Sequence, residues 1–304
     1  MTVLVTLVGE QPIPNLLPVR ALRPAQVLYV HTGRGPRGTE KVARRVARLV
    51  PESTPDFVLV DAHDLIKART QLQAKLAQET DLVFNLTGGT KPMAIAAYAL
   101  SLERAVPFVY FQSEGPHGRE VQSVLCHYRF EQGAPVLVRR ESLAPGLLSL
   151  DDYFRAHWEQ GYDESGPSDE RGGDLERLVR AVLEGWVDEI KAGVRPRGFK
   201  EQVEIDLAIR CGNQVGIIEV KTGGAGSGKH AVDQLTTVAA RELSGTYTAR
   251  FVVTGGEYRQ EYRAVAQELS VRVVQVETYG NRLAPASVAL LQQAIAEHLP
   301  CRHP

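Results

Sequence analysis

The chain has 304 residues, of which 43% are hydrophobic and 23% are charged, and its formal net charge at pH 7 is −1. This composition is ordinary for a globular protein, and the length favours two domains over a single hydrophobic core. The near-zero net charge excludes a basic field over the whole surface, so any nucleic-acid site must be local.

Residues 1–8 form an apolar run that is too short to span a membrane and lacks the basic region and cleavage site of a signal peptide. We expect a buried strand there, in a cytoplasmic protein with no membrane partner. Cys126, Cys211 and Cys301 show neither paired spacing nor a CxxC motif. They indicate a reducing compartment and argue against a cysteine-ligated zinc site.

Apolar runs alternate with amphipathic segments over residues 2–111. The runs are unbroken rather than alternating, which is typical of parallel strands covered by helices on both faces. We therefore predict a doubly wound α/β domain whose ligand binds beyond the carboxyl ends of its strands. The expected strands are residues 3–8, 26–31, 56–61, 81–86 and 106–111, and the expected helices are residues 39–50, 64–78 and 90–104.

Unusual residues follow several of these strands, above all the sequence NLTGGTK at residues 85–91. Its two glycines permit close approach of the backbone, while two threonines and Lys91 supply hydroxyls and a cation beside a helix N-terminus. This combination suits a phosphate or another anionic ligand. A plain strand-to-helix turn with Thr90 as the N-cap would favour the same residues. Because several strand ends carry such residues, we favour ligand binding.

Two glycine-rich loops fit other nucleotide-binding patterns. The GxGxxG sequence at residues 33–38 matches much of a dinucleotide fingerprint, but Pro36 and two arginines crowd it and no domain suited to hydride chemistry follows. Residues 223–230 nearly spell a Walker A loop, but His230 stands where a magnesium-binding Ser or Thr is needed. A nicotinamide enzyme and a P-loop ATPase therefore remain weaker alternatives.

The polar, glycine-rich stretch at residues 161–173 is the best linker in the chain. We expect an N-terminal domain over residues 1–145, a linker segment over residues 146–172 and a C-terminal domain over residues 173–304. Residues 119–130 and 135–140 are predicted to pair as a hairpin, followed by a helix over residues 148–160. The C-terminal domain is predicted as an α/β layer with a mixed sheet. Its expected elements are a long helix over residues 174–191, strands within 202–221, 250–254 and 271–276, and helices over 229–243, 258–269 and from 285 onward.

The hairpin at residues 202–221, with its turn at residues 211–213, carries charges on a hydrophobic sheet. Asp206 points away from the apolar row of the first strand, and Glu219 and Lys221 share a face of the second. A buried sheet holds such charges only at a cost, unless a metal ion or a substrate compensates them. The alternative is a surface hairpin with a solvated salt bridge.

Asp206 and Glu219-Val220-Lys221, 13 residues further on, resemble the D…ExK core of restriction-endonuclease-like, PD-(D/E)xK, nucleases. Ile205 departs from the pattern, because such enzymes usually carry Pro or a similar residue before the first acid. The resemblance implies that Asp206, Glu219 and the carbonyl of Val220 hold Mg²⁺ or Mn²⁺, which prefer oxygen ligands. Lys221 would orient or help deprotonate a water, or neutralise the transition state. We expect one essential metal and leave a second open.

Two residues outside the hairpin strengthen this resemblance. Glu176 lies in the first turn of the predicted long helix, where it either reaches the metal site or simply favours the helix dipole. Gln234 falls on the following predicted helix, where such nucleases often carry a glutamine.

The N-terminal half resembles a CARF domain, the Rossmann-like sensor of cyclic oligoadenylates in type III CRISPR defence. The likeness rests on NLTGGTK at residues 85–91, GEQP at residues 9–12 and Gln112-Ser113. It implies a homodimer that binds its signal, most simply cyclic tetra-adenylate, across the CARF interface. The implied site residues are Thr87, Gly88, Gly89, Thr90 and Lys91 for ribose and phosphate, and Gln11, Pro12, Thr32 and Gln112 for the adenine pockets, with Gly9 beside them.

A CARF domain followed by a D…ExK nuclease is the layout of one group of CRISPR ancillary effectors, so the resemblance covers nearly the whole chain. It implies a metal-dependent endonuclease, active once the signal is bound, that cuts single-stranded or nicked DNA, RNA or both. Whether the protein also cleaves its activator stays open. The alternative from a different class is a non-catalytic, CARF-regulated nucleic-acid-binding or regulatory protein, against which the presence of Asp206, Glu219 and Lys221 argues.

Overall fold

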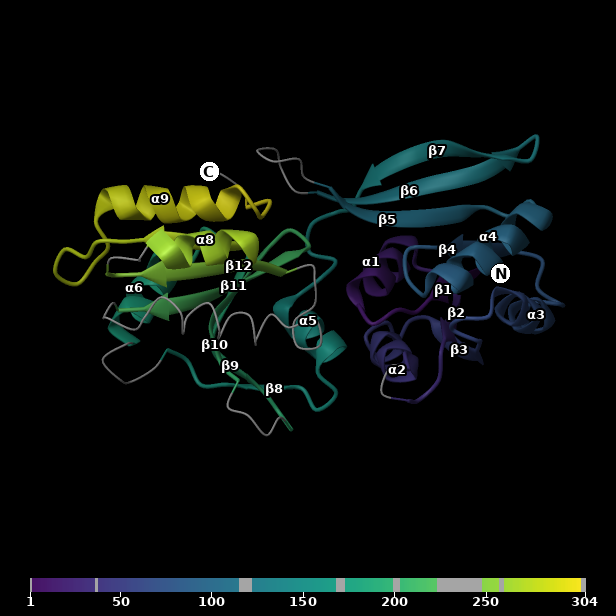
Figure 1. Cartoon of the computed structure of the whole chain (residues 1–304), viewed down its shortest axis with the longest axis horizontal. Helices are drawn as coiled ribbons and strands as arrows, with labels where there is room; N and C mark the ends of the chain where they lie inside the picture. Colours follow the sequence, from purple (N-terminus) through teal and green to yellow (C-terminus); the bar gives the residue numbers. More distant parts are fainter. Residues whose placement is uncertain are drawn as a thin grey trace. The chain divides into compact units, whose positions relative to one another are not determined.

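The computed structural model of the chain describes residues 2–35, 38–114, 122–167, 173–198, 203–222, 248–256 and 260–301 (Figure 1). The chain divides into two compact units, with Met1–Glu114 and Gln122–Leu147 in unit 1 and Leu148–Pro304 in unit 2. The predicted helix over residues 229–243, the glycine-rich loop at residues 223–230 and Gln234 lie outside the described residues.

Unit 1 is built on a seven-stranded sheet with the order β3-β2-β1-β4-β5-β6-β7. The first five strands in that order are parallel, and the last two form an antiparallel hairpin, so the predicted α/β architecture is confirmed. The strands are β1 (Val3–Leu7), β2 (Gln26–His31), β3 (Thr54–Leu59), β4 (Leu82–Asn85), β5 (Phe108–Glu114), β6 (Gln122–Glu131) and β7 (Ala134–Ser142).

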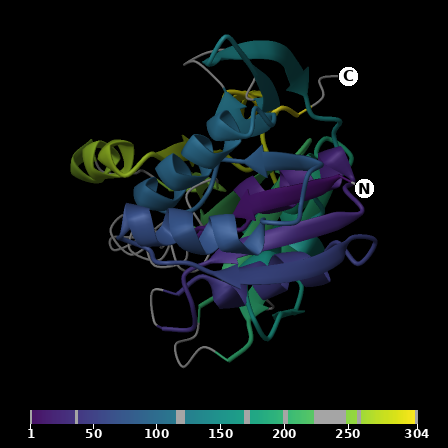
Figure 2. The ribbon, with the colours of Figure 1, turned by 90° about the vertical axis from the view of Figure 1, so that its right-hand side faces the viewer.

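On one face of this sheet, two helices pack against the strands and form an apolar core with them. Leu72 and Met93 pack with Val5, Leu7 and Val30, all of them almost inaccessible to solvent. Figure 2 shows the two blue helices that carry these contacts against the purple strands. These two helices are α3 (Leu65–Lys75) and α4 (Lys91–Glu103). A further helix, α2 (Glu40–Arg48), follows β2 in the chain. The sequence analysis predicted all three helices within a few residues of these bounds.

The sequence analysis missed a further helix, α1 (Ile13–Leu22), which begins directly after the loop that follows β1. Pro14 lies in its first turn, where the missing N–H removes no helical hydrogen bond. Pro18 lies inside the helix and lowers the intrinsic helix propensity of the segment. Leu16 and Leu17 are fully buried, so tertiary packing outweighs that propensity.

Unit 2 has a six-stranded sheet with the order β13-β12-β11-β10-β9-β8, in which β11, β12 and β13 are parallel and the other neighbours are antiparallel. The mixed sheet agrees with the prediction. The strands are β8 (Tyr162–Glu164), β9 (Glu189–Pro196), β10 (Ile205–Cys211), β11 (Gln214–Lys221), β12 (Thr248–Thr254) and β13 (Val271–Gln275). The described helices are α5 (Leu150–His157), α6 (Gly173–Leu183), α8 (Gln260–Glu268) and α9 (Pro285–Ala296).

One predicted helix at the start of unit 2 differs from the structure. The long helix expected over residues 174–191 ends at Leu183, because Gly185 adopts a left-handed φ of 79° and the chain then enters β9. β9 pairs with β10, where Val194 lies opposite Ile205. Within the segment expected as a linker, residues 146–172, the predicted helix over residues 148–160 is present as α5, and the strand β8, which was not predicted, pairs with β9 at the edge of the sheet.

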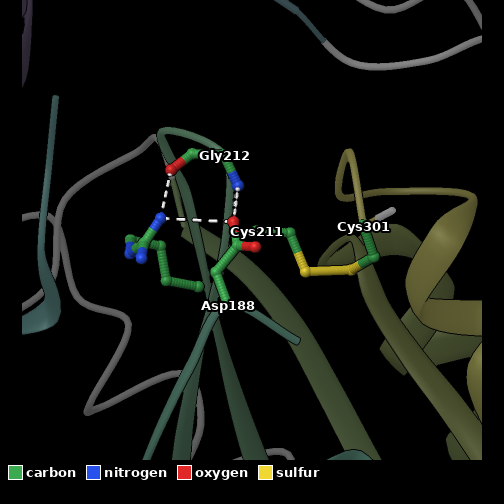
Figure 3. Close-up of a disulfide and its surroundings, with 5 residues drawn as sticks. Asp188, Cys211, Gly212 and Cys301 are labelled. Carbon is green, nitrogen blue, oxygen red and sulfur yellow. Dashed lines mark hydrogen bonds and ion pairs between the residues drawn. A yellow bond between two sulfur atoms is a disulfide. The ribbon is translucent and has the colours of Figure 1, made fainter. Parts of the chain in front are cut away.

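Two of the three cysteines are paired, although their spacing in the sequence did not indicate a pair. Cys211, the last residue of β10, and Cys301, which follows α9, form a disulfide across a sequence separation of 90 residues (Figure 3). Sequence spacing did not indicate the pair because the fold brings the two Cα atoms to 4.8 Å. Beside it, Gly212 N–H donates to Asp188 Oδ2 at 2.6 Å, which fixes the β10–β11 turn. Cys126 is buried and unpaired.

No helix in the described part of the chain is both long enough and apolar enough to cross a membrane.

Candidate functional site

The charged hairpin of β10 and β11 lies in the middle of the sheet of unit 2. β11 is flanked by β10 and β12, and Leu207 and Ile218 pack into a core that includes Val179 of α6 and Leu291 of α9. The side chain of Glu219 is only 2% exposed. The alternative of a solvated surface hairpin was therefore wrong, and the acidic residues are held in a largely apolar setting.

Asp206 marks the point where the two strands separate. Their antiparallel ladder extends from the turn to the pair Leu207–Ile218. One step further along, Val220 N–H donates to Asp206 Oδ2 at 2.7 Å, so a carboxylate takes the place of a backbone carbonyl. Since directly opposed residues of an antiparallel pair share a face, continuing the register places Asp206 opposite Glu219 on one face.

Glu219 and Lys221 stand two residues apart on β11 and form an ion pair, with 2.5 Å between Lys221 Nζ and Glu219 Oε1. Glu176, in the first turn of α6, is 7% exposed and lies close enough for its charge to raise the pKa of both Asp206 and Glu219. The structure thus brings together four of the five residues that sequence reasoning assigned to catalysis. The fifth, Gln234, lies outside the described residues.

Burial has the largest effect on the pKa values of the Asp206 and Glu219 carboxyls. Burial and the neighbouring Glu219 raise the pKa of Asp206 to about 8, against the opposing effects of the Val220 N–H and Lys221. Burial also raises the pKa of Glu219, although Lys221 opposes this shift. Burial disfavours the charged form of Lys221, but attraction to Glu219 and Asp206 outweighs it and raises the lysine pKa. At neutral pH the lysine is therefore protonated.

This donor set fits a divalent cation with a preference for oxygen. Buried carboxylates that repel one another are stabilised when a cation compensates their charge, and Mg²⁺ and Mn²⁺ favour carboxylate and carbonyl ligands. Asp206, Glu219 and the backbone carbonyl of Val220 supply such oxygens. Among the described residues, no three His, Cys, Asp or Glu side chains form a metal-binding group by themselves. The carbonyl and water would thus have to complete the coordination.

The second candidate site is the carboxyl edge of the sheet of unit 1, which we define as the described residues that follow β1, β2 and β4, together with Gln112 in the last part of β5. β1 pairs with β2 on one side and β4 on the other, so the strand order reverses beside it. Such a switch point is where doubly wound sheets bind ligands. The expected residues Gly9, Gln11 and Pro12 follow β1, the stretch at residues 87–91 follows β4, and Thr32 follows β2.

Close backbone packing explains the glycines at this edge. A methyl group on Gly88 would lie 2.1 Å from the carbonyl oxygen of Leu7, and one on Gly9 would lie 3.2 Å from the amide nitrogen of Gly89. The loops after β1 and β4 therefore touch through their backbones. Gly89 also adopts a left-handed φ of 76°. The packing of the two loops therefore requires these glycines whether or not a ligand binds at this edge.

A buried polar network that sequence reasoning missed supports the loop after β4. Asn85 Nδ2 donates to Thr6 Oγ1 at 3.0 Å, and Thr6 Oγ1 donates to Asn15 Oδ1 at 2.6 Å. Asn85 Oδ1 accepts hydrogen bonds from the backbone N–H and hydroxyl of Thr87. The available signal was the polar pair Thr6 and Asn85 inside two otherwise apolar strands.

Both threonine hydroxyls in this loop are engaged within the protein. Thr87 Oγ1 donates to Asn85 and accepts from Phe111 N–H at 2.7 Å, while Thr90 Oγ1 donates to the carbonyl of Ala62 at 2.6 Å. Thr90 also caps α4. Lys91, the first residue of α4, is exposed and carries a positive charge at a helix N-terminus.

Of the residues expected to line adenine pockets, Gln11 and Pro12 follow β1 and Thr32 follows β2, whereas Gln112 lies within β5, opposite Val124 of β6, because β5 extends beyond the predicted end at residue 111. Gln11, Thr32 and Gln112 are partly exposed, whereas Pro12 is buried and serves as the N-cap of α1. Gln112 Oε1 accepts from Cys126 Sγ at 3.5 Å, and Thr32 N–H donates to Thr39 Oγ1 at 3.1 Å. The fold thus gathers these residues at one edge, although each also has a contact of its own or a buried position.

Comparisons with known proteins place these features in a family context. Residues 3–136 match the family model described as the Card1 CARF domain. The structure of Can2 from Sulfobacillus thermosulfidooxidans in complex with cyclic tetra-adenylate is similar, with a TM-score of 0.76 and 14% identity over 98% of this chain and 99% of that one. Protein VC1899 from Vibrio cholerae has a TM-score of 0.72 and 14% identity, with 97% of each chain covered. No curated protein matches the chain.

A third structure, a type III CRISPR defence DNA nuclease activated by cyclic oligoadenylate, has a TM-score of 0.56 and 16% identity. The match covers 95% of this chain but only 44% of that one. The chain therefore has a CARF-type, Rossmann-like N-terminal unit followed by a second α/β unit, and shares this fold along its whole length with Can2 and VC1899.

Proposed function

We propose that the protein is a metal-dependent endonuclease of type III CRISPR defence that a cyclic oligoadenylate activates. The observation that carries the proposal is the meeting of Asp206, Glu219 and Lys221 on one buried sheet face in a chain that also has a CARF-type unit. Burying charges of this kind costs free energy, and groups with perturbed pKa values cluster at functional sites. The substrate is single-stranded or nicked DNA, RNA or both.

In this proposal Asp206, Glu219 and the carbonyl of Val220 hold Mn²⁺ or Mg²⁺, and Glu176 adds negative charge nearby. When bound, the ion would lower the pKa of a water and stabilise negative charge on the scissile phosphate. The Val220 N–H orients the carboxylate of Asp206 through the bond to Oδ2. Glu219 forms an ion pair with the ammonium group of Lys221 and so holds it on the same face of the sheet.

Of the roles considered for Lys221, the structure favours stabilisation of charge. Its pKa is raised by Glu219 and Asp206, so the side chain stays protonated at neutral pH and is a poor proton acceptor. A fixed ammonium group beside a phosphodiester would instead neutralise the charge that develops during cleavage.

For the sensor, we propose that cyclic tetra-adenylate binds at the carboxyl edge of unit 1, in a homodimer that places two such edges around one ligand. Lys91 and the N-terminus of α4 would bind phosphate, and Gly88 and Gly89 would allow close approach of the ribose-phosphate chain. Thr87 and Thr90, whose hydroxyls bond within the protein, would mainly hold the loop in shape. Gln11, Pro12, Thr32 and Gln112 would line the adenine pockets, with Gly9 beside them. The Can2 structure, which contains cyclic tetra-adenylate, supports this choice of ligand.

We also propose that the protein acts in the cytoplasm, where its signal and its nucleic-acid substrate would be found. Structural disulfides are unusual in the cytosol of most mesophiles. The redox state of Cys211 and Cys301 in the cell is therefore a separate question, and the proposed reaction does not depend on it.

The first test is the cleavage of labelled single-stranded DNA and RNA in the presence of Mn²⁺ and cyclic tetra-adenylate. Glu219→Gln keeps the shape of the side chain but removes one of the two proposed carboxylate ligands. We expect cleavage to fall by at least about 100-fold, because loss of such a ligand removes metal affinity as well as activity. Binding of cyclic tetra-adenylate by the same variant should be unchanged.

Glu184→Gln is the matched control, since it makes the same chemical change at an exposed position of unit 2. Cleavage by Glu219→Gln at the rate of the Glu184→Gln control would exclude the proposed active site. If the wild type binds the activator but cuts neither DNA nor RNA, the alternative of a non-catalytic CARF-regulated protein would replace the proposal.

A further inference from the structure

Apart from Thr32, the loop after β2, which carries the GxGxxG pattern, has no role in the proposed function so far. Its described residues fold tightly upon one another: Gly38 N–H donates to Gly35 O at 2.8 Å and Glu40 N–H to Gly33 O at 3.0 Å. A methyl group on Gly38 would lie 2.2 Å from the carbonyl oxygen of Gly33. The glycine at position 38 is therefore required by the packing of the loop itself, which accounts for it without a dinucleotide.

A buried carboxylate lies beneath this loop and orients an exposed arginine. Glu40 is 6% exposed, and its two carboxylate oxygens accept hydrogen bonds from Arg34 Nε at 2.9 Å and Arg44 Nε at 2.8 Å. Arg44 in turn lies over the ring of Phe57, 4.8 Å from its centroid. The contact of Arg34 with Glu40 uses Nε, and 81% of the arginine side chain remains exposed. Arg34 is thus a cation held at one end and open to solvent at the other.

The two arginines leave this cluster with a net positive charge. Hydrogen bonds from Arg34 and Arg44 lower the pKa of Glu40 to about 2, so the carboxylate stays ionised at neutral pH. Burial lowers the pKa of the adjacent His31, whose Nδ1 accepts a hydrogen bond from Gly33 N–H. Two guanidinium groups around one carboxylate leave one positive charge in excess, and Arg34 is the more exposed of the two.

This cluster belongs to the same carboxyl edge as Lys91. β2 pairs with β1 up to Val30 opposite Leu7, and Val8 N–H donates to Val30 O at 2.8 Å. The loops after β1 and β2 therefore leave the sheet side by side. Neighbouring strands lie about 4.8 Å apart, so the ends of β2 and β4, on either side of β1, are about 10 Å apart. A ligand with several phosphates can span this distance, and a guanidinium group binds phosphate through two parallel hydrogen bonds.

We propose that Arg34, oriented by the buried carboxylate of Glu40, is a second phosphate-binding group of the carboxyl edge and engages a different phosphate from the one at Lys91. This inference rests on the proposed function, because it assigns part of the binding energy for a polyanionic activator. It also gives the glycine-rich loop after β2 a role in presenting Arg34.

The test is a titration of the full-length protein with cyclic tetra-adenylate in EDTA, so that cleavage plays no part. Arg34→Gln should weaken binding by at least about 10-fold, because losing one hydrogen bond between charged partners costs about 10- to 100-fold and the proposed homodimer loses one in each protomer. The slope of log K against log salt concentration should become shallower by up to about 1.4, since one phosphate contact with a single strand accounts for about 0.7 and two are lost. A change in shape alone would not alter that slope.

Arg34→Lys keeps the charge and loses the planar fork, so it should retain the wild-type salt slope while recovering only part of the affinity. Lys41→Gln removes one positive charge from the exposed surface of α2 and serves as the matched control. If Arg34→Gln and Lys41→Gln bind with the same affinity and the same salt slope, the inference is overturned. Failure of the wild type to bind any cyclic oligoadenylate would overturn the proposed function instead.

Discussion

At the scale of single residues, the most informative feature is the carboxyl of Asp206. It accepts a hydrogen bond from Val220 N–H, which favours the ionised form, yet its pKa is raised to about 8 by burial and by Glu219. Without a bound cation the folded protein therefore holds a proton that the unfolded chain releases. A divalent ion would displace this proton, so its binding should strengthen as the pH rises toward 8.

This shift predicts how stability depends on pH when metal is absent. A carboxyl whose pKa is higher in the folded state stabilises that state at low pH, and the stabilisation is lost as the pH rises from the usual carboxyl value of 3.8 toward 8. The free energy of unfolding of the wild type in EDTA should fall over this window, by at most about 1.4 kcal/mol per pH unit from this group. Asp206→Asn should flatten the fall and be the more stable protein at pH 8.

Chemical denaturation at several pH values between 4 and 8 measures the effect. The control is again Glu184→Gln, whose exposed position gives no reason for a changed slope. Parallel curves for the wild type and Asp206→Asn would mean that Asp206 does not carry the buried proton.

At the scale of helices and strands, local patterns predicted the elements whose burial is regular. The unbroken apolar runs of β1, β2 and β4 indicated parallel strands, and the alternation of Ile205, Leu207 and Ile209 in β10 placed Asp206 off the apolar face. The pattern failed where tertiary structure overrides local preference. α1 contains prolines but buries Leu16 and Leu17, and the helical period after Leu183 is broken by Gly185.

Sequence patterns did not indicate individual side-chain contacts, whether these join near or distant residues. The motif at residues 85–91 correctly drew attention to the edge, but nothing in it indicates that Thr87 bonds Asn85 and Phe111, or that Thr90 bonds Ala62. The same holds for Glu40 beneath Arg34. Burial of Glu219 could be suspected from the apolar strand around it, whereas the neighbouring Glu176 depends on how α6 packs.

The disulfide leads to a prediction about the element it constrains. It joins the end of β10 to the segment after α9, and the closed loop spans 90 residues of sequence. Cross-links of this kind stabilise proteins by about 2–4 kcal/mol, largely by restricting the unfolded chain. The double variant Cys211→Ser/Cys301→Ser should lose about that much in the free energy of unfolding of unit 2.

Urea denaturation with and without dithiothreitol provides the measurement. The reductant should destabilise the wild type and the Cys126→Ala control, in which the buried unpaired thiol is removed, but should leave the double variant unchanged. If a thiol titration of the unfolded, non-reduced wild type detects three free thiols, the disulfide is absent and the prediction is contradicted.

At the scale of the whole molecule, the proposed function couples the proposed ligand-binding edge of unit 1 to the proposed active site of unit 2. Lys91 and Asp206 are more than a hundred residues apart in sequence and lie in separate compact units. Ligand binding can control cleavage only if the activator binds more tightly to the active state than to the inactive one. The raised pKa of Asp206 shows that a metal-free site is electrostatically unfavourable, so metal binding is one step that activation could favour.

The most direct test of the central claim is the initial rate of cleavage of labelled single-stranded DNA and RNA by the full-length protein with Mn²⁺, measured with and without cyclic tetra-adenylate. We predict that a saturating activator raises the rate by about 5- to 150-fold, the usual range of coupling between sites, and that EDTA abolishes it. Equal rates with and without a bound activator would contradict the claim that unit 1 controls the nuclease site of unit 2.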